Sequence, residues 1–236
     1  MDSKTDGKKK QTRPRILEIV GPAGAGKSTL YKSLSHYSNE IRLGNFPDVR
    51  NLSNAPFFIW YGLQTSLAFL RPPKPNSRKL TRREFAWLSI LNGWPKLLRK
   101  ELKTSNEVII LDQGPVYLLA ELGLFGPDFL RSDRATPIWE TNYLQWAATL
   151  DAIVWLDAPD ECLIQRIRNR EKDHVVKDQT DPVVFEFLGR YRKMYEHILS
   201  GLADHRRDLK VLYFDTGRKT TEEIASQILA EFWLIT

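Results

Sequence analysis

The amino-acid sequence predicts an α/β fold in which helices flank a parallel β-sheet. Short apolar runs alternate with longer segments of helical periodicity, which is the pattern of strand–helix–strand units. The run at 108–112 is continuously apolar up to a final acidic residue, as expected of a central strand buried on both faces. A glycine-rich motif links the first apolar run to the first helix. The predicted strands lie at 16–20, 41–43, 108–112, 152–157 and 210–215.

The glycine-rich motif reads G-x-x-x-x-G-K-S, the pattern of a phosphate-binding loop. Its glycines let the backbone wrap around a polyphosphate with several N–H groups pointing inward, and the following helix adds its positive dipole end. Lys27 would place an ammonium on the β- and γ-phosphates, and the Ser28 hydroxyl would complete the shell of a Mg²⁺ ion. A chance glycine-rich turn would need the strand, the spacing and the helix all to coincide, so the sequence predicts nucleotide binding. The residues assigned to this binding are Gly21, Pro22, Ala23, Gly24, Ala25, Gly26, Lys27, Ser28 and Thr29.

Length and composition are those of a soluble globular protein. The chain has 236 residues, of which 42% are hydrophobic and 27% charged, which suits one domain with a small insertion or lid. Its single cysteine, Cys162, excludes an internal disulfide and favours the cytoplasm. No initial apolar run resembles a signal peptide, and we expect no transmembrane segment.

The net charge of +6 is concentrated in part at the N-terminus. Residues 1–14 are predicted to be a basic, flexible tail, and residues 15–236 the folded domain. Such a tail is usually solvated, so nucleic acid is not the expected partner, although contact with nucleic acid or an anionic surface is the alternative. The rest of the basic excess suits a protein that handles phosphorylated small molecules. The chain could also pair with a second copy of itself.

The loop after the second strand, 44–50, is predicted to lie where the acceptor of a phosphoryl group would bind. Ligands of open α/β sheets sit outside the carboxyl ends of the strands. Asp48 and Arg50 are the residues of this loop with suitable chemistry. The alternative is a turn aspartate and a surface arginine.

A helical block at 55–103 follows this loop and is expected to cover the acceptor side. Its first part, 55–70, is rich in aromatic residues and is interpreted as a buried helix, or as the wall of an acceptor pocket to which Trp60 contributes. Its second part, 81–103, begins with the signature of a capping box. The Gly-Trp-Pro sequence at 93–95 is expected to break or kink this second helix.

Asp112 ends the third predicted strand, beside the phosphate-binding loop. An aspartate in this position commonly holds magnesium, directly or through water, and could also accept the proton of an attacking hydroxyl. A helix-capping aspartate is the structural alternative. Gln113 follows it and would face the acceptor.

Two arginines after the fourth strand are predicted to act on the transferred phosphate. Arg166 and Arg170 are four residues apart and would share one face of a helix. Two guanidinium groups repel each other unless an anion lies between them, which suggests an arginine clamp. The polar stretch 171–181 lacks an apolar period and is interpreted as a lid, with a solvated charged face as the alternative.

These features together resemble the nucleoside and nucleotide kinases of the P-loop proteins, with a pattern after the lid that is similar to thymidylate kinases. The phosphate-binding loop is the most specific of the matches. The others are the strand-end Asp112-Gln113-Gly114, the Leu-x-Ala-Pro helix start, Arg166 and Arg170, the polar lid and the spacing Phe187-x-x-Arg190-x-Arg192-x-x-Tyr195.

The resemblance implies a three-layer sandwich whose five-stranded parallel sheet has the order 2-3-1-4-5, with helices on both faces and a lid. It implies ATP as donor, Mg²⁺ as cofactor and a small-molecule acceptor such as a nucleotide, a nucleoside or a similar metabolite. Lys27, Asp112, Arg166 and Arg170 become the catalytic residues, and Ser28 and Asp112 the magnesium ligands. The loop at 216–219, with Gly217 and Arg218, becomes a wall for the adenine ring.

The acceptor side departs from the thymidylate kinase pattern. Those enzymes carry an arginine where this chain has Gln113, and an acidic-proline signature where it has Asn45-Phe46-Pro47-Asp48.

Two other classes of function remain as alternatives. A regulatory NTPase would want a D-x-x-G strand end, where Pro115 replaces the glycine, and an N-K-x-D base reader, which the sequence lacks. A nucleotide-dependent nucleic-acid-binding protein would use the basic tail and the loop at 71–83.

Overall fold

A computed structural model of the chain describes residues 15–37, 40–44, 46–47, 54–68, 78–105 and 107–233. Five parallel strands form one sheet in the order β2-β3-β1-β4-β5, which confirms the order that the family resemblance implied. The strands are β1 (Ile16–Val20), β2 (Ile41–Gly44), β3 (Val108–Leu111), β4 (Ala152–Asp157) and β5 (Lys210–Asp215). The central strand β1 therefore delivers the glycine-rich motif between the ends of β3 and β4.

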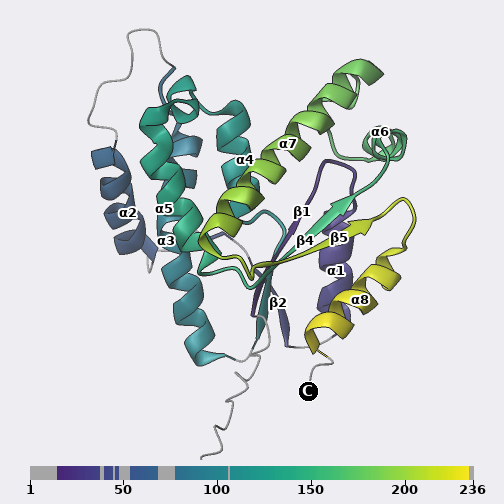
Figure 1. Ribbon diagram of the computed structural model, residues 1–236, viewed down its shortest axis with the longest axis horizontal. Helices are drawn as coiled ribbons and strands as arrows, with labels where there is room; N and C mark the ends of the chain where they lie inside the picture. The colour runs from purple at the N-terminus through teal and green to yellow at the C-terminus, as the bar shows by residue number, and fades with distance from the viewer. Residues whose placement is uncertain are drawn as a thin grey trace, which may run out of the picture.

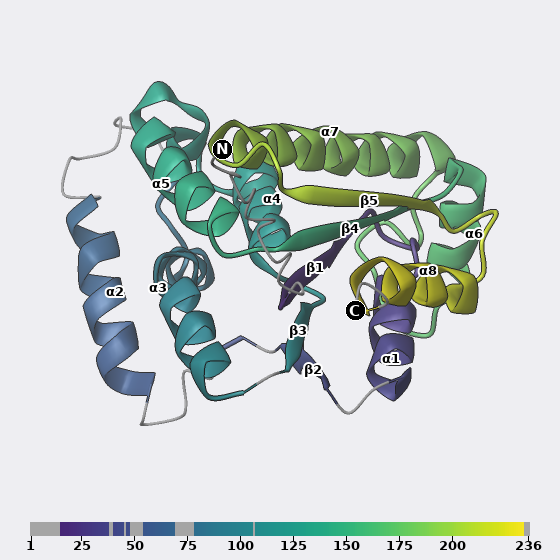
Figure 2. The same ribbon diagram turned by 60° about the horizontal axis from the view of Figure 1, so that its bottom comes forward.

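Helices cover both faces of the sheet, so the molecule has three layers (Figures 1 and 2). One face carries α1 and α8, and the other carries α4 and α7 with α3 and α5 beside them. The helices are α1 (Lys27–Tyr37), α2 (Ala55–Ala68), α3 (Arg82–Thr104), α4 (Pro115–Phe125), α5 (Thr136–Ala147), α6 (Asp160–Asn169), α7 (Asp181–His205) and α8 (Thr221–Trp233). Two short 3-10 turns, Asp128–Arg131 and Asp133–Ala135, connect α4 to α5.

The side chains of β1 alternate between the two layers because successive residues of a strand point to opposite faces. Ile16 and Val20 join the core under α3, α4, α5 and α7. Leu17 and Ile19 join the core under α1, α6 and α8. Glu18 lies between Ile16 and Val20 and is fully buried, which the apolar reading of this strand did not anticipate.

The helix α3 begins with the capping box that the sequence predicts. The Thr81 hydroxyl accepts a hydrogen bond from the Glu84 amide at 3.2 Å, and the Glu84 carboxylate accepts one from the Thr81 amide at 2.7 Å. Arg78 binds the same carboxylate through both terminal nitrogens, at 2.9 and 2.6 Å. These contacts, the Arg78 bond first, lower the pKa of Glu84 to about 2.

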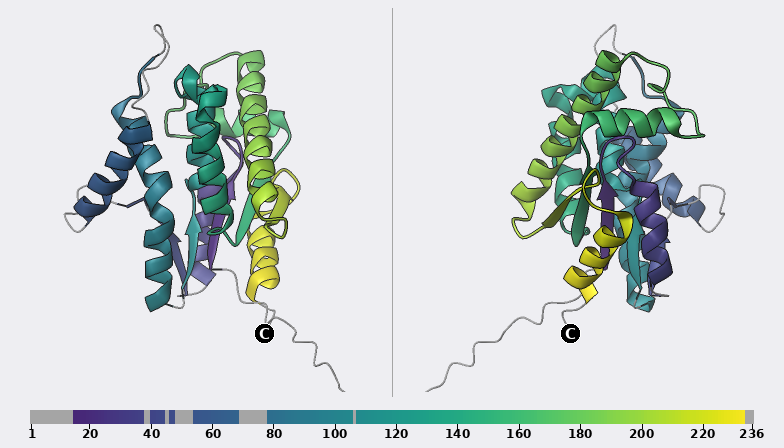
Figure 3. Two further views of the ribbon diagram at one scale, coloured as in Figure 1. Left: turned by 60° about the vertical axis from the view of Figure 1, so that its left-hand side comes forward. Right: turned by 90° about the vertical axis from the view of Figure 1, so that its right-hand side faces the viewer.

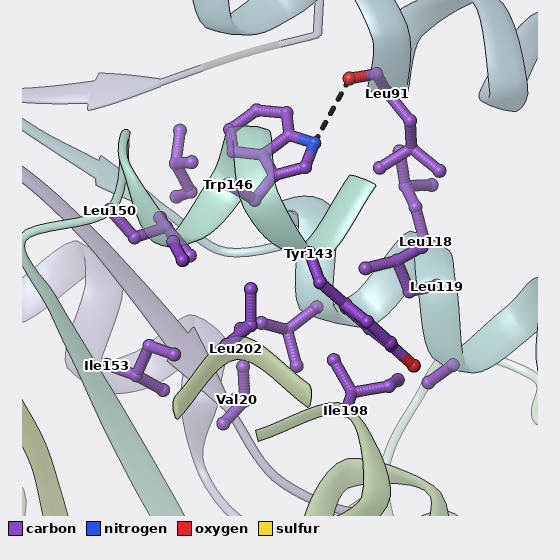
Figure 4. Packing of buried hydrophobic residues seen from close by; sticks show 14 of the residues in the cluster. Val20, Leu91, Leu118, Leu119, Tyr143, Trp146, Leu150, Ile153, Ile198 and Leu202 are labelled. Carbon is purple, nitrogen blue, oxygen red and sulfur yellow. Dashed lines mark hydrogen bonds between the residues drawn. The ribbon is translucent and has the colours of Figure 1, made fainter. Parts of the chain in front are cut away.

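Of the break or kink expected at 93–95, the break does not occur, because α3 remains helical through Pro95. The kink stays a prediction. A proline inside a helix removes the N–H that would bind the carbonyl four residues earlier, here that of Leu91. The indole Nε1 of Trp146 on α5 supplies the missing donor to the Leu91 carbonyl at 3.1 Å (Figure 4). The tertiary contact thus stabilises a helix that the local sequence would interrupt.

The helices α2 and α3 lie side by side, as expected of the helical block at 55–103. Phe57 and Tyr61 of α2 pack against Gly93 of α3 so closely that a Cβ on Gly93 would lie 2.2 Å from the Phe57 ring. Figure 3 shows α2 as the outermost helix of this part. Its outward face carries Ile59 and Trp60, which are 72% and 57% exposed. Within the described residues, none of the helices combines the length and the apolar character needed to cross a membrane.

Candidate active site

A cleft of about 880 Å³ opens at the carboxyl ends of β1, β3 and β4, which is where open parallel sheets bind ligands. The glycine-rich loop, α6 and the turn after β5 line the side of the cleft that the sequence assigned to the donor, and α4 and α7 line the other side. The described lining residues include Lys27, Ser28, Asp112, Gln113, Arg166 and Arg170. The cleft therefore brings together most of the residues that the sequence assigned to the site.

The loop of residues 21–26 has the tight geometry that its glycines were expected to allow. Gly21 and Gly24 have φ angles of +145° and +81°, where side chains are rarely tolerated. A Cβ on Gly21 would lie 2.1 Å from the Leu156 carbonyl oxygen, and one on Gly24 would lie 2.8 Å from that of Leu163. The loop is thus pressed against β4 and α6, and only glycine fits at these two positions.

Lys27 lies over the loop, at the first position of α1. Its Nζ donates to the carbonyl oxygens of Gly21 and Pro22, at 2.7 and 2.8 Å. Burial lowers the pKa of Lys27 to about 8, with a smaller lowering from Arg170, while Asp112 and Asp157 oppose the shift. The ammonium is still mainly charged at pH 7, and it is held by weak neutral acceptors that a polyphosphate can replace.

Ser28 and Asp112 meet across the cleft. The Ser28 hydroxyl donates to the Asp112 carboxylate at 3.0 Å, and burial raises the pKa of that carboxylate against the opposing effects of Ser28 and Lys27. A hydroxyl and a carboxylate are the hard oxygen ligands that Mg²⁺ prefers, and this ion usually takes only one or two protein ligands besides phosphate and water. The donor atoms of this pair therefore suit magnesium. Among the described residues no cluster of three His, Cys, Asp or Glu side chains could hold a metal ion.

Arg166 lies on the donor side, where it joins the loop to the turn after β5. Its guanidinium donates to the Gly24 carbonyl at 3.3 Å, and to the hydroxyl and the carbonyl of Thr216, both at 2.8 Å. Three protein acceptors thus fix the side chain before any ligand binds. This arrangement supports a role in holding the nucleotide site together.

Arg170 occupies a different setting, because α6 ends at Asn169. The expectation that the two arginines share one helical face is therefore wrong: Arg170 has extended backbone angles and follows the helix. Both side chains still line the cleft. The Arg170 carbonyl accepts a hydrogen bond from Lys177 at 2.7 Å, which ties the start of the predicted lid to its middle.

The predicted lid residues 171–180 form bends and turns without helix or strand, and residue 181 begins α7. Asp173 and His174 line the cleft, and the His174 ring lies edge-on to Phe187 of α7, with centroids 5.5 Å apart. The position suits a lid. Its movement stays a prediction.

The turn at 216–219 lines the donor end of the cleft. Its Gly217 amide donates to the Asp215 carboxylate at 2.8 Å, and the Arg218 guanidinium lies 3.3 Å from the same carboxylate. The Arg218 side chain is 87% exposed, so it is accessible at the mouth of the cleft. The adenine-binding role of this turn stays a prediction.

The predicted acceptor residues are not brought together. Gln113 is exposed and lines the cleft beside Asp112. Trp60 lies on the outward face of α2 and is not among the described residues that line the cleft. Asp48 and Arg50 fall outside the described residues.

One wall of the cleft is aromatic, which was not predicted from the sequence. Tyr117 of α4 and Phe187, Tyr191 and Tyr195 of α7 line the cleft beyond Asp112. The rings of Phe187 and Tyr191 lie 4.9 Å apart, and the Tyr191 hydroxyl donates to the Glu121 carboxylate. The sequence singled out Phe187 and Tyr195 only as part of the spacing after the lid, and the packing of α7 on α4 shows that these rings face the cleft.

Arg192 was also missed as a positioning group, although it stands in the spacing that the sequence singled out. Its guanidinium binds the Asp157 carboxylate through two bonds, at 2.7 and 2.9 Å. The carbonyl of Asp157 in turn accepts a hydrogen bond from the Thr216 amide at 2.7 Å. Arg192 thus anchors α7 to the end of β4, next to the turn that lines the donor side.

The fold is that of P-loop nucleotide kinases. The chain is similar to the solved structure of thymidylate kinase from Candida albicans, with a TM-score of 0.51 at 18% sequence identity, covering 93% of this chain and 92% of that one. It is also similar to deoxyadenosine kinase from M. mycoides with bound dATP, with a TM-score of 0.50 at 19% identity, covering 92% and 98%. No family model matches the chain, and no curated protein resembles it in sequence. At these identities the likeness shows the fold alone.

Proposed function

We propose that the protein is a P-loop kinase that transfers the γ-phosphoryl group of ATP to a nucleoside or a nucleotide. One observation carries the proposal: a single cleft holds a phosphate-binding loop at one end, the Ser28–Asp112 pair in the middle and an aromatic wall at the other end. The three parts correspond to what a phosphoryl transfer needs, namely a grip on the donor, a place for the metal and a surface for a planar acceptor.

On the donor side the chain's own residues act by position and charge. The N–H groups of the loop and the helix α1 start face the polyphosphate, and Lys27 exchanges its two carbonyl partners for phosphate oxygens. Arg166 holds the turn at 216–219 against the loop and so shapes the nucleotide site. Arg170 makes no such contact within the described structure and is available to stabilise charge that develops on the transferred group.

Ser28 and Asp112 are the residues that would hold Mg²⁺. When bound, the ion neutralises charge on the phosphate oxygens of the donor. The hydrogen bond between the two side chains supports this role for Asp112 over that of a helix cap, because the carboxylate already faces the first turn of α1.

On the acceptor side, the aromatic residues of α4 and α7 form a surface suited to a flat ring. Gln113, at the boundary between the two halves, is placed to position the accepting group. Two of the similar structures are of deoxyadenosine kinase, one with bound dATP and one with the products dCMP and dCDP, which fits acceptors of the nucleoside and nucleotide class. A cytoplasmic location is part of the same proposal and is supported by the single cysteine.

The proposal is tested by measuring ADP release with ATP and Mg²⁺ across nucleosides, nucleoside monophosphates and small polar metabolites. We expect release that depends on one acceptor class, and loss of that release in Lys27→Ala with the melting temperature little changed. Lys32→Ala, an exposed lysine further along α1, is the matched control and should keep full activity. Release that is independent of any acceptor would instead indicate a regulatory NTPase. Unchanged activity in Lys27→Ala would refute the site.

A further inference from the structure

Glu18 is a fully buried acidic residue in the central strand of the sheet. Burial raises the pKa of its carboxyl group to about 8, and the hydrogen bonds that it accepts from backbone amides oppose this shift. Its register partners are Leu111 on β3 and Ile153 on β4, both apolar and buried. A carboxylate in such surroundings costs free energy unless hydrogen bonds satisfy it. The donors that bind Glu18 therefore indicate its structural role.

Those partners are backbone amides at the start of α4. The Val116 amide donates to Oε2 of Glu18 and the Tyr117 amide donates to Oε1, each at 3.0 Å. Helix starts leave several N–H groups without an internal partner, and a residue at the N-cap normally satisfies them. Here the N-cap is Gly114, which makes no side-chain bond. Glu18 accepts hydrogen bonds from these N–H groups instead, although it lies 98 residues before Val116 in the chain.

The contact also fixes the turn that precedes α4. A Cβ on Gly114 would lie 2.6 Å from the Glu18 carboxyl carbon, so the turn backbone is seated directly on the carboxylate. The two residues before Gly114 are Asp112 and Gln113, which both line the cleft. Glu18 thus lies directly beneath the segment that carries the carboxylate bound to Ser28.

We propose that Glu18 is a positioning residue of the active site, which holds the turn of residues 112–114 so that Asp112 meets Ser28 and Gln113 faces the acceptor. The expected effect of Glu18 on catalysis rests on the proposed kinase function. The hydrogen bonds between Glu18 and the start of α4 do not depend on that function. Glu18 touches neither substrate nor metal in this role. Its effect passes through the backbone of the turn.

The test compares Glu18→Gln and Glu18→Met with the wild-type protein. The Gln side chain has one acceptor oxygen, so it can accept from only one of the two amides, and its NH₂ group faces the N–H of the other amide. The Met side chain accepts neither hydrogen bond. We expect turnover to fall, and the Mg²⁺ concentration for half-maximal activity to rise, by about 10- to 100-fold, the loss typical of groups that support a metal ligand. The KM for ATP should change less than about threefold, because the loop at 21–26 is untouched.

Leu202→Ala is the matched control, because it removes core contacts at the far end of α7 and lowers the melting temperature without touching the turn. Its turnover and Mg²⁺ requirement should stay at the wild-type values. Gly114→Ala places a methyl group against the Glu18 carboxyl group. It should therefore lower turnover and raise the Mg²⁺ requirement as Glu18→Gln does. If Glu18→Gln lowers only the melting temperature, as Leu202→Ala does, the positioning role is refuted.

Two further measurements separate this proposal from the kinase proposal. Hydrogen exchange should quicken at the amides of Val116 and Tyr117 in Glu18→Gln more than in Leu202→Ala. The gain in ATP affinity on adding Mg²⁺, measured by direct binding, should shrink in Glu18→Gln. Both can be measured without any acceptor, so a wild-type protein that transfers no phosphate would refute the kinase function alone. Wild-type exchange and an unchanged Mg²⁺ effect would overturn the role of Glu18.

Discussion

The hydrogen bond from Trp146 to the Leu91 carbonyl predicts a specific coupling between α5 and the proline of α3. Pro95 cannot donate to Leu91, and both Trp146 and Leu91 are fully buried. Trp146→Phe therefore removes packing and also leaves a buried carbonyl without a partner, which costs about 1–3 kcal/mol beyond the packing loss. In a Pro95→Ala background the new backbone N–H can donate to Leu91, so this second cost should disappear.

The assay is a double-mutant cycle of urea unfolding at equilibrium, with all four proteins analysed at a common slope. We expect a coupling free energy of at least about 1 kcal/mol, with Trp146→Phe less damaging when residue 95 can donate. Lys96→Ala, an exposed change on the same helix, should add to Trp146→Phe within about 0.3 kcal/mol. A coupling within about 0.3 kcal/mol of zero in the Pro95 cycle would show that another donor satisfies Leu91 and would refute the argument.

Three further predictions concern charged side chains. Arg166→Ala should mainly raise the KM for ATP, because its guanidinium holds the nucleotide site together, whereas Arg170→Ala should mainly lower turnover; the reverse split in steady-state kinetics would contradict these roles. The bond with Arg78 depresses the pKa of Glu84 from 4.5 to about 2, so its stabilisation is present above pH 4.5 and is lost as the pH falls toward 2. Because Arg78 is half-exposed, we expect the free energy of unfolding of the wild type to exceed that of Glu84→Gln by only about 1 kcal/mol at pH 6, measured with urea, and by clearly less at pH 3. An equal difference at the two pH values would refute the role of this ion pair. Finally, the lowered pKa of Lys27, about 8, predicts that binding of ATP in the absence of Mg²⁺ weakens as the pH rises above 8, a dependence that Lys27→Arg should shift to higher pH in a titration.

The strand positions and the glycine-rich loop between β1 and α1 could be predicted from local sequence patterns alone. The five strands were expected from buried apolar runs, and the structure places them within a residue or two of those runs. The loop could be recognised because glycines at fixed spacing, a strand before and a helix after are all local properties of the chain. The same holds for the Thr81–Glu84 capping box, whose partners are three residues apart.

Contacts between groups far apart in the sequence depend on how the elements pack in three dimensions. The folded chain brings Arg166 to Thr216 and Gly24, continues α3 through Pro95 with a hydrogen bond from Trp146, and turns aromatic side chains of α7 toward the cleft. The first two of these contacts join residues that are 50 or more positions apart, and the third depends on how two helices pack. A local pattern of apolar and polar residues encodes neither kind of contact. Glu18 is the clearest case. An acidic residue within an apolar strand is visible in the sequence, but the amides that it binds belong to α4, which begins 97 residues later in the chain at Pro115 and packs on β1 only in the folded structure.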